Sequence, residues 1–187
     1  MVLRGHGKAL ICVRLTVIAP YILIRIKIMI EFKNINEFPK GTLYNQLVDA
    51  YSFNKECQIC WDNMWKNYDE FFYTNEDIAN KYGFVTVVDG NVVGHITWDP
   101  RNRPDFVEIG HNLILTKYKG NKYGKFQLQE AIRRIKEYNV KRIIVTTNEL
   151  LLPAQKNYES VGFKKIGTRI NNETPFTGNY IDYEMVL

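Results

Sequence analysis

The pattern of apolar and polar positions predicts a chain that mixes strands and helices. A first strand is expected at residues 30–35, and apolar residues at helical spacing predict helices at 42–53 and 59–72. Asp89-Gly90-Asn91 is a tight-turn sequence between two apolar runs, and it predicts a β-hairpin over residues 84–98. The elements expected after the hairpin are a strand, a helix, a strand, a helix and two final strands, at 107–115, 123–138, 141–147, 153–161, 163–169 and 180–187.

The order of these elements already limits the fold. The strands at 107–115 and 141–147 are joined through a helix, and such a crossover connects parallel strands. The hairpin and the two final strands predict antiparallel neighbours. With 187 residues and 45% hydrophobic content, the chain is expected to form one α/β (α+β) domain with a sizeable core.

The formal charge of +5 is unevenly distributed along the chain. Residues 1–28 carry five basic side chains and no acidic one, so the rest of the chain is neutral overall. A broad nucleic-acid-binding face is therefore disfavoured. The apolar stretch 15–24 is interrupted by Pro20 and is too short to span a bilayer. We expect residues 1–28 to be an extension outside the functional domain, which is assigned to residues 29–187.

The three cysteines, Cys12, Cys57 and Cys60, are too few and too unevenly spaced for a disulfide framework. The Cys57–Cys60 pair has no second ligand pair at the spacing of a structural zinc site. No metal is expected, and a reducing, cytoplasmic location is the simplest prediction.

A basic turn rich in glycine is the strongest chemical signal in the chain. It links the strand 107–115 to the helix 123–138, so unpaired backbone N–H groups and the positive end of the helix dipole meet there and favour a phosphate. The spacing does not match a nucleotide P-loop or a dinucleotide fingerprint. The predicted anion-binding residues are Lys119, Gly120, Asn121, Lys122, Tyr123, Gly124 and Lys125.

A second motif follows downstream, at residues 154–163, with the form A-x-x-x-Y-x-x-x-G-F. Together with the basic turn, it resembles the GNAT superfamily of acyl-CoA-dependent N-acyltransferases, from about Phe84 to the C-terminus and more loosely from Met29. Lys122 departs from the family pattern, because many members have glycine at that position. The resemblance implies a mixed, mostly antiparallel sheet with a splayed parallel strand pair, flanked by helices, and acetyl-CoA as co-substrate.

The resemblance also implies roles for individual residues. Tyr158 matches the usual proton donor to the coenzyme sulfur, and a phenol's ordinary pKa of about 10 suits that exchange. Glu108 and His111 are alternative general bases; strict alternation places them on opposite faces of the strand unless a bulge, for which Gly110 is a candidate, intervenes. The backbone expected to pair with the pantetheine arm is that of Leu113, Ile114 and Leu115, with an oxyanion donor near Ile114 and with Asn148 as a further amide-binding residue.

The acceptor is less defined by the sequence. A small-molecule amine or a peptide amine is expected, and some of the aromatic residues of 61–73 are candidates for its pocket, although aromatic residues at helical spacing more often belong to the core. The alternative function is an inactive acyl-CoA sensor that regulates a partner. A homodimer is possible by analogy with the superfamily, and no membrane partner is expected.

Overall fold

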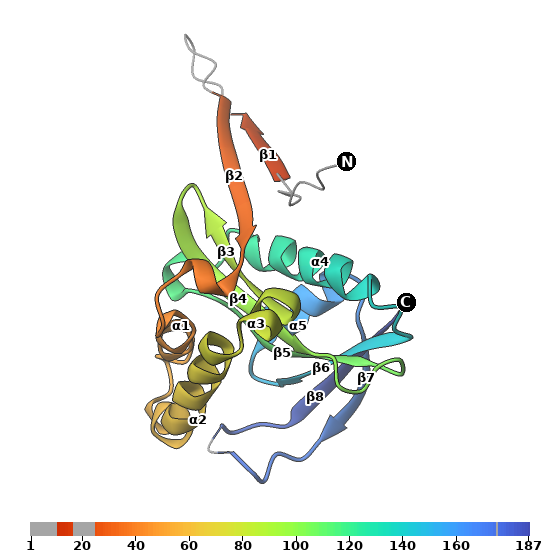
Figure 1. Ribbon diagram of the computed structural model, residues 1–187. Helices are drawn as coiled ribbons and strands as arrows, with labels where there is room; N and C mark the ends of the chain where they lie inside the picture. The colour runs from red at the N-terminus through yellow and green to blue at the C-terminus, as the bar shows by residue number, and fades with distance from the viewer. Residues whose placement is uncertain (1–10, 17–24, 175) are drawn as a thin grey trace.

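The computed structural model describes residues 11–16, 25–174 and 176–187. Its centre is an eight-stranded mixed sheet in the order β1-β2-β3-β4-β5-β6-β8-β7 (Figure 1). The strands are β1 Ile11–Thr16, β2 Arg25–Lys33, β3 Gly83–Val88, β4 Asn91–Asp99, β5 Val107–Ile114, β6 Arg142–Asn148, β7 Lys164–Arg169 and β8 Tyr180–Val186. The helices are α1 Thr42–Ala50, α2 Lys55–Thr74, α3 Glu76–Tyr82, α4 Tyr123–Lys136 and α5 Leu152–Ser160, with short 3-10 turns at Ile35–Glu37 and Thr116–Tyr118.

The predicted mixed, mostly antiparallel sheet is confirmed. β5 and β6 form the parallel pair, and the other neighbouring strands run antiparallel. The hairpin turns at Asp89 and Gly90, whose φ values of 47° and 78° fit a tight turn of the predicted kind. The helix α3 was not predicted, although it has acidic residues in its first turn and Lys81 in its last.

The N-terminal boundary of the sheet differs from the expectation. β2 begins at Arg25 and pairs with β1 through the register Ile11↔Ile30 to Thr16↔Arg25, so strand structure crosses the expected boundary at residue 28. This pair extends away from the rest of the sheet (Figure 1). Residues 1–10 and 17–24 lie outside the described residues, and the assignment of 29–187 as the functional domain stays a prediction.

The two faces of the sheet bury different sets of side chains. On one face α4 and α5 pack on the main apolar core, which includes Trp98, Leu128 and Ile143. On the other face α1, α2 and α3 cover β3 and part of β5. Within the described part of the chain, no helix is both long and apolar enough to cross a bilayer.

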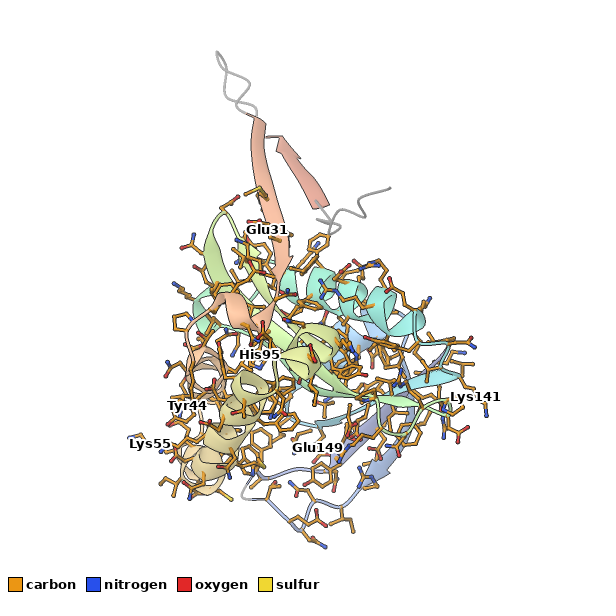
Figure 2. The ribbon with its side chains drawn as sticks, in the orientation of Figure 1. Glu31, Tyr44, Lys55, His95, Lys141 and Glu149 are labelled. Atoms are coloured by element: carbon orange, nitrogen blue, oxygen red, sulfur yellow. The ribbon has the colours of Figure 1, made fainter. Side chains whose placement is uncertain are left out.

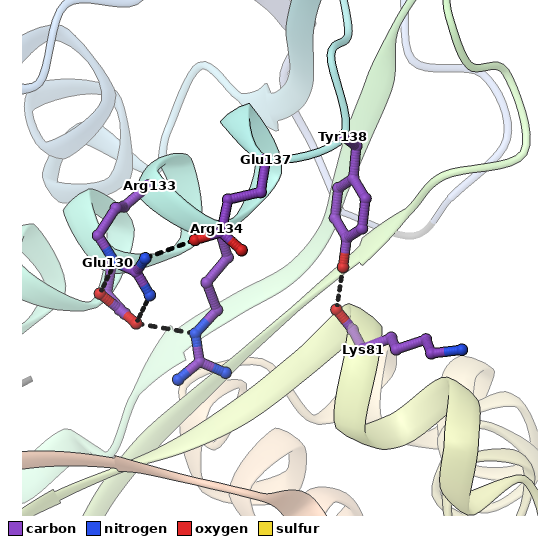
Figure 3. A network of polar contacts seen from close by, with 6 residues as sticks. All are labelled: Lys81, Glu130, Arg133, Arg134, Glu137 and Tyr138. Carbon is purple, nitrogen blue, oxygen red and sulfur yellow. Dashed lines mark hydrogen bonds and ion pairs between the residues drawn. The ribbon is translucent and has the colours of Figure 1, made fainter. Parts of the chain in front are cut away.

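The C-terminal half of α4 is held by a network of charged side chains (Figure 3). Glu130, which is 5% exposed, accepts hydrogen bonds from Arg133 at 2.8 Å and Arg134 at 2.8 Å. Arg133 also donates to Glu137, and the Tyr138 hydroxyl donates to the carbonyl of Lys81 on α3. The ion pairs lie within α4 and stabilise the helix itself, and the Tyr138 hydroxyl links the end of the helix to α3.

The parallel pair separates soon after it begins. β5 and β6 are paired only at Val107↔Ile143 and Glu108↔Ile144, while β6 and β8 are paired along the whole of β6. Beyond Glu108 the two strands diverge, which confirms the splayed pair implied by the family resemblance. The sheet therefore opens a gap at the C-terminal ends of β5 and β6.

Candidate active site

A β-bulge in β5 decides which side chains face the gap. Ile96 pairs with Asn112 and Trp98 with Ile109, so β5 has one extra residue at this point, beside Gly110. The bulge reverses the alternation after Gly110. Glu108 therefore lies on the same face of the sheet as His111. The sequence predicts opposite faces unless a bulge intervenes, and the bulge is present.

Glu108 is half-buried and, among the described residues, forms no ion pair or hydrogen bond. Burial raises the pKa of its carboxyl group, and the neighbouring carboxylate of Asp99 adds to the increase, whereas Arg169 and Arg101 lower it. A carboxylate with a raised pKa binds a proton more readily than an exposed one. Glu108 thus has the properties of a candidate base.

His111 lies beside a cluster of polar side chains formed by Tyr68, His95, Thr97 and Gln46. Its ring contacts the edge of Tyr68 at 4.6 Å between centroids, and burial lowers its pKa to about 4, so the imidazole is neutral at pH 7. Tyr68 also stacks on His95, which is labelled inside the molecule in Figure 2, and its hydroxyl lies 2.9 Å from that of Thr97. Gln46 of α1 contacts His95 Nδ1 at 3.0 Å.

Tyr158 lies on α5 and is 4% exposed. Its ring packs against Phe163 at 5.7 Å and Tyr183 at 6.0 Å, which explains why the motif combines Tyr with a following Gly-Phe. Gly162, with φ of 106°, ends the helix and turns the chain so that Phe163 can reach the core. Burial raises the pKa of Tyr158 to about 12, so the phenol keeps its proton at neutral pH.

A chain of side-chain amides orients the Tyr158 hydroxyl. Gln127 Nε2 lies within 2.9 Å and 3.1 Å of the carbonyl oxygens of His95 and Leu113, which can only accept, so its orientation is defined. The same nitrogen donates to Asn112 Oδ1 at 2.8 Å, which leaves Asn112 Nδ2 to donate to Tyr158 Oη at 3.4 Å. Because the phenol oxygen accepts from Asn112, its own hydrogen is free to be donated elsewhere.

Sequence reasoning missed both amides. Gln127 lies on the predicted helix and Asn112 on the predicted strand, and no local signal distinguishes them from surface residues. Gln127 is fully buried, and its Oε1 accepts from Thr86 at 2.7 Å, so one side chain links β3, β4, β5 and α4.

The basic turn has the geometry expected of an anion site. Gly120 and Lys122 have φ values of 86° and 63°, so Lys122 takes the left-handed conformation where many family members have glycine. Among the described residues, the backbone N–H groups of residues 120–124 have no hydrogen-bond partner, and no side chain caps α4. Lys119, Asn121, Lys122, Tyr123 and Lys125 belong to this turn and to the first turn of α4.

The strand that leads into the turn is anchored on one side and free on the other. The Leu115 N–H donates to the carbonyl of Val93 at 2.8 Å, so Leu113 and Leu115 direct their backbone groups toward β4. By alternation the backbone groups of Ile114 face the gap. Thr116 N–H donates to Asp49 on α1 at 2.6 Å, which fixes the end of the strand.

Asn148 lies at the end of β6, but its amide is engaged by a loop. Its Nδ2 donates to the carbonyls of Thr177 and Gly178 at 3.1 Å and 3.3 Å, and its Oδ1 accepts from the Leu150 N–H at 2.9 Å. The side chain thus ties the β7–β8 loop to β6. Its predicted contact with a pantetheine amide stays a prediction.

A cavity opens where β5 and β6 separate, and it encloses about 690 Å³ of space, part of it open to solvent. His111 and Asn112 line it from β5, Thr146 from β6, and Tyr158 from α5. Glu108 lies on the same face of the sheet as His111, but it does not line the cavity. The structure thus brings the predicted proton donor and one of the two predicted bases to a single cavity.

The splayed strands, the uncapped turn before α4 and the buried tyrosine beside the gap define the acetyltransferase class of fold. The sequence matches the Acetyltransferase (GNAT) family over residues 43–163, and the chain belongs to that family. A search of the curated proteins found no match to this chain.

Solved structures support the same fold. A protein from Acinetobacter baylyi classed as an acetyltransferase shares 18% identity and a TM-score of 0.67, with 86% of this chain and 94% of that chain covered. The ribosomal-protein-S18-alanine N-acetyltransferase of Escherichia coli shares 16% identity and a TM-score of 0.61, with 85% and 93% covered. A Salmonella typhimurium protein classed as an acetyltransferase, solved with acetyl-CoA, shares 12% identity and a TM-score of 0.62, with 85% and 93% covered.

Proposed function

We propose that this protein transfers an acetyl group from acetyl-CoA directly to a primary amine. Acetyl-CoA supplies the acetyl group as an activated thioester. The observation that carries the proposal is the position of Tyr158, a protonated phenol on the wall of the cavity into which the splayed strands open. The N–H groups of residues 120–124 are backbone donors without partners in the described part of the chain.

The turn before α4 is suited to the diphosphate of the co-substrate. Five consecutive N–H groups, at residues 120–124, are without partners in the described part of the chain, and Lys119, Lys122 and Lys125 add positive charge. The gap between β5 and β6 leads from this turn to Tyr158. The Ile114 N–H, which by alternation faces the gap, is the donor that we propose for the thioester oxygen.

Tyr158 acts as the acid in this proposal. Its hydroxyl accepts from Asn112, so its own proton is available for the departing sulfur. A pKa raised to about 12 keeps that proton in place until the thiolate forms. Asn112 and Gln127 are positioning residues, because they act through the orientation of the phenol.

Glu108 is proposed as the base that receives the amine proton. Its raised pKa and its lack of an ion pair among the described residues suit it to attract an ammonium group and then remove its proton. His111, whose pKa is about 4, is neutral and contributes a hydrogen-bonding ring to the cavity wall.

The test is steady-state release of coenzyme A thiol on a panel of primary amines, with Tyr158→Phe compared to the unaltered protein. We expect kcat to fall about 100-fold, the size of a lost general acid, while the acetyl-CoA Kd measured by calorimetry changes less than about twofold. Tyr183→Phe is the matched control. Tyr183 is a buried tyrosine of the same core whose hydroxyl contacts Glu159 outside the cavity.

Equal loss in both variants would assign Tyr158 a purely structural role. Tight acetyl-CoA binding without turnover on any amine would overturn the proposed transfer and favour an acyl-CoA sensor. The amine acceptor, the cytoplasmic location and a homodimer are predictions from the sequence that the fold itself does not test.

A further inference from the structure

Besides Tyr158, four aromatic side chains line the cavity, alongside asparagine and threonine side chains that include Asn171 and Thr174. Tyr51 follows α1, Trp61 belongs to α2, and Phe176 and Tyr180 come from the end of the β7–β8 loop and the start of β8. The Tyr51 and Trp61 rings are 5.4 Å apart in an edge arrangement. Trp61 is also the one residue of the aromatic run 61–73 that lines this cavity.

The aromatic walls are joined into a continuous rim. Phe53, in the corner between α1 and α2, packs its ring against Phe176 at 5.8 Å and against Tyr51 at 6.0 Å. Phe176 is 6% exposed, although it lies in a loop. The rim brings together two parts of the chain that are more than a hundred residues apart.

Charge is missing from the lining. Within the described residues, no Asp, Glu, Lys or Arg side chain lines the cavity, and the ring of His111 is neutral. The nearby carboxylates of Asp99 and Asp182 already bond to arginines, with Arg101 Nε at 2.8 Å and Arg169 Nε at 2.6 Å.

Glu108 and Glu149, which follows the lining residue Asn148, both lack an ion pair among the described residues. Glu149 accepts a hydrogen bond from Asn179 at 3.0 Å, whereas the Glu108 side chain accepts none in the described part of the chain. One such carboxylate can pair with one ammonium group. A second or third ammonium beside the aromatic side chains would lose its hydration without gaining a paired carboxylate. Attraction by the aromatic faces, of about 0.5–2 kcal/mol, offsets only part of that cost. Rings with a flat apolar face are favoured instead, because they bury area and pack edge to face with aromatic walls.

Resting on the proposed amine acetylation, we propose that the acceptor is a primary monoamine attached to an aromatic or other flat apolar group. The amine lies toward Glu108, and the apolar group lies between Trp61, Tyr51 and Phe176. Polyamines and aminoglycosides, which carry several ammonium groups, are poor acceptors.

The experiment measures kcat/KM at saturating acetyl-CoA for three probes: 2-phenylethylamine, its saturated analogue 2-cyclohexylethylamine, and spermidine. We expect 2-phenylethylamine to exceed spermidine by at least about tenfold and to exceed the cyclohexyl analogue by a smaller factor. The variant Trp61→Leu is expected to raise the KM for 2-phenylethylamine about tenfold, with the KM for acetyl-CoA unchanged.

Phe71→Leu is the matched control, because Phe71 is a 47% exposed ring on the same helix outside the cavity. The inference is overturned if spermidine is the better acceptor, or if Trp61→Leu and Phe71→Leu change the KM for 2-phenylethylamine equally. Failure of the proposed function looks different, because no amine would then release thiol at all.

Discussion

The N-termini of α1 and α4 differ in how their unpaired backbone N–H groups are satisfied. At α1, the backbone N–H groups of Gly41, Leu43 and Tyr44 all donate to the carboxylate of Asp69, at 2.8, 3.0 and 3.1 Å, and Asp69 is 3% exposed. At α4, the N–H groups of residues 120–124 have no partner in the described part of the chain.

Each helix start concentrates free donors and positive potential that favour an anion. The anion at α1 is a side chain of α2, so that end is complete within the protein and serves to join two helices. At the N-terminus of α4 no side chain caps the helix in the described part of the chain, and Lys119, Lys122 and Lys125 lie in the turn and in the first turn of the helix, which suits the phosphate that we propose there. The contrast distinguishes a helix start whose donors are satisfied within the protein from one whose donors are left free for the anion that we propose.

The largest expected effect comes from removing the internal anion. Asp69→Ala leaves three backbone donors near α1 without their acceptor, and we expect a loss of about 3 kcal/mol in the free energy of unfolding measured with urea. Asp77→Ala, at the exposed first turn of α3, should cost much less. Equal effects of the two changes would remove the distinction drawn for α1.

The next effect tests how much the ion pairs near the C-terminus of α4 contribute to stability. Glu130→Gln removes the buried charge that pairs with Arg133 and Arg134, and we expect a loss of about 2 kcal/mol in the free energy of unfolding. Glu137→Gln, at an exposed carboxylate that also pairs with Arg133, is the control. Acetyl-CoA affinity of the folded Glu130→Gln protein should stay within about twofold.

The same carboxylate predicts a pH dependence. Burial raises the pKa of Glu130, but the hydrogen bonds from Arg133 and Arg134 outweigh it, and the folded-state pKa is lowered from 4.5. Its ionised form therefore contributes stability above pH 4.5, and this contribution is lost as the pH falls below that value. Thermal unfolding between pH 6 and pH 3 should show a smaller loss of stability in Glu130→Gln than in the unaltered protein.

A smaller effect follows from giving α4 its own anion. Lys122→Asp places a carboxylate at the residue immediately before α4, where Asp tolerates the left-handed conformation, and it should compete with the phosphates of acetyl-CoA. We expect the Kd for acetyl-CoA to rise about tenfold, measured by calorimetry, with no loss of stability.

Lys55→Asp makes the same charge change in the first turn of α2, where Asn54 already accepts from the Cys57 N–H at 3.0 Å. Its Kd should be unchanged. A weakening equal to that in Lys122→Asp would indicate a general charge effect instead of a site at α4.

The smallest effect concerns one exposed lysine of the turn. Lys119→Gln removes a charge but no backbone donor, so the Kd for acetyl-CoA should rise about twofold at 0.1 M salt. Because salt screens exposed charges, the difference should disappear near 1 M salt. A difference that persists at high salt would show a direct contact instead of a screened attraction.

Most of the sheet and four of the five helices could be predicted from the sequence, because hydrophobic period and turn residues are local signals. The hairpin at Asp89 and the Pro-to-Gly limits of α5 are examples. α3 was missed because seven residues carry too little periodicity, even with acidic residues at its start. The strand–helix–strand order predicted the parallel pair, the family resemblance implied that it splays, and the structure confirms both. The role that the resemblance implied for Tyr158 stays a prediction.

The contacts that orient the site depend on the fold. Gly110 was a possible bulge in the sequence, but only the register between β4 and β5 shows the extra residue that brings Glu108 and His111 to one face. Gln127 and Asp69 bond to residues as far as 41 and 28 positions away. Polar side chains of this kind resemble surface residues until the elements around them are assembled.

The two pairs that join β5 to β6 make the sheet a structure of two panels with a narrow seam. Strands β1 to β5 form one panel, and β6, β8 and β7 form the other. A molecule bound along the opening would contact both parts of the sheet and connect them. Occupancy would then suppress hinge-like motion between the panels, and the rigidity of the protein would rise and fall with the supply of its own co-substrate.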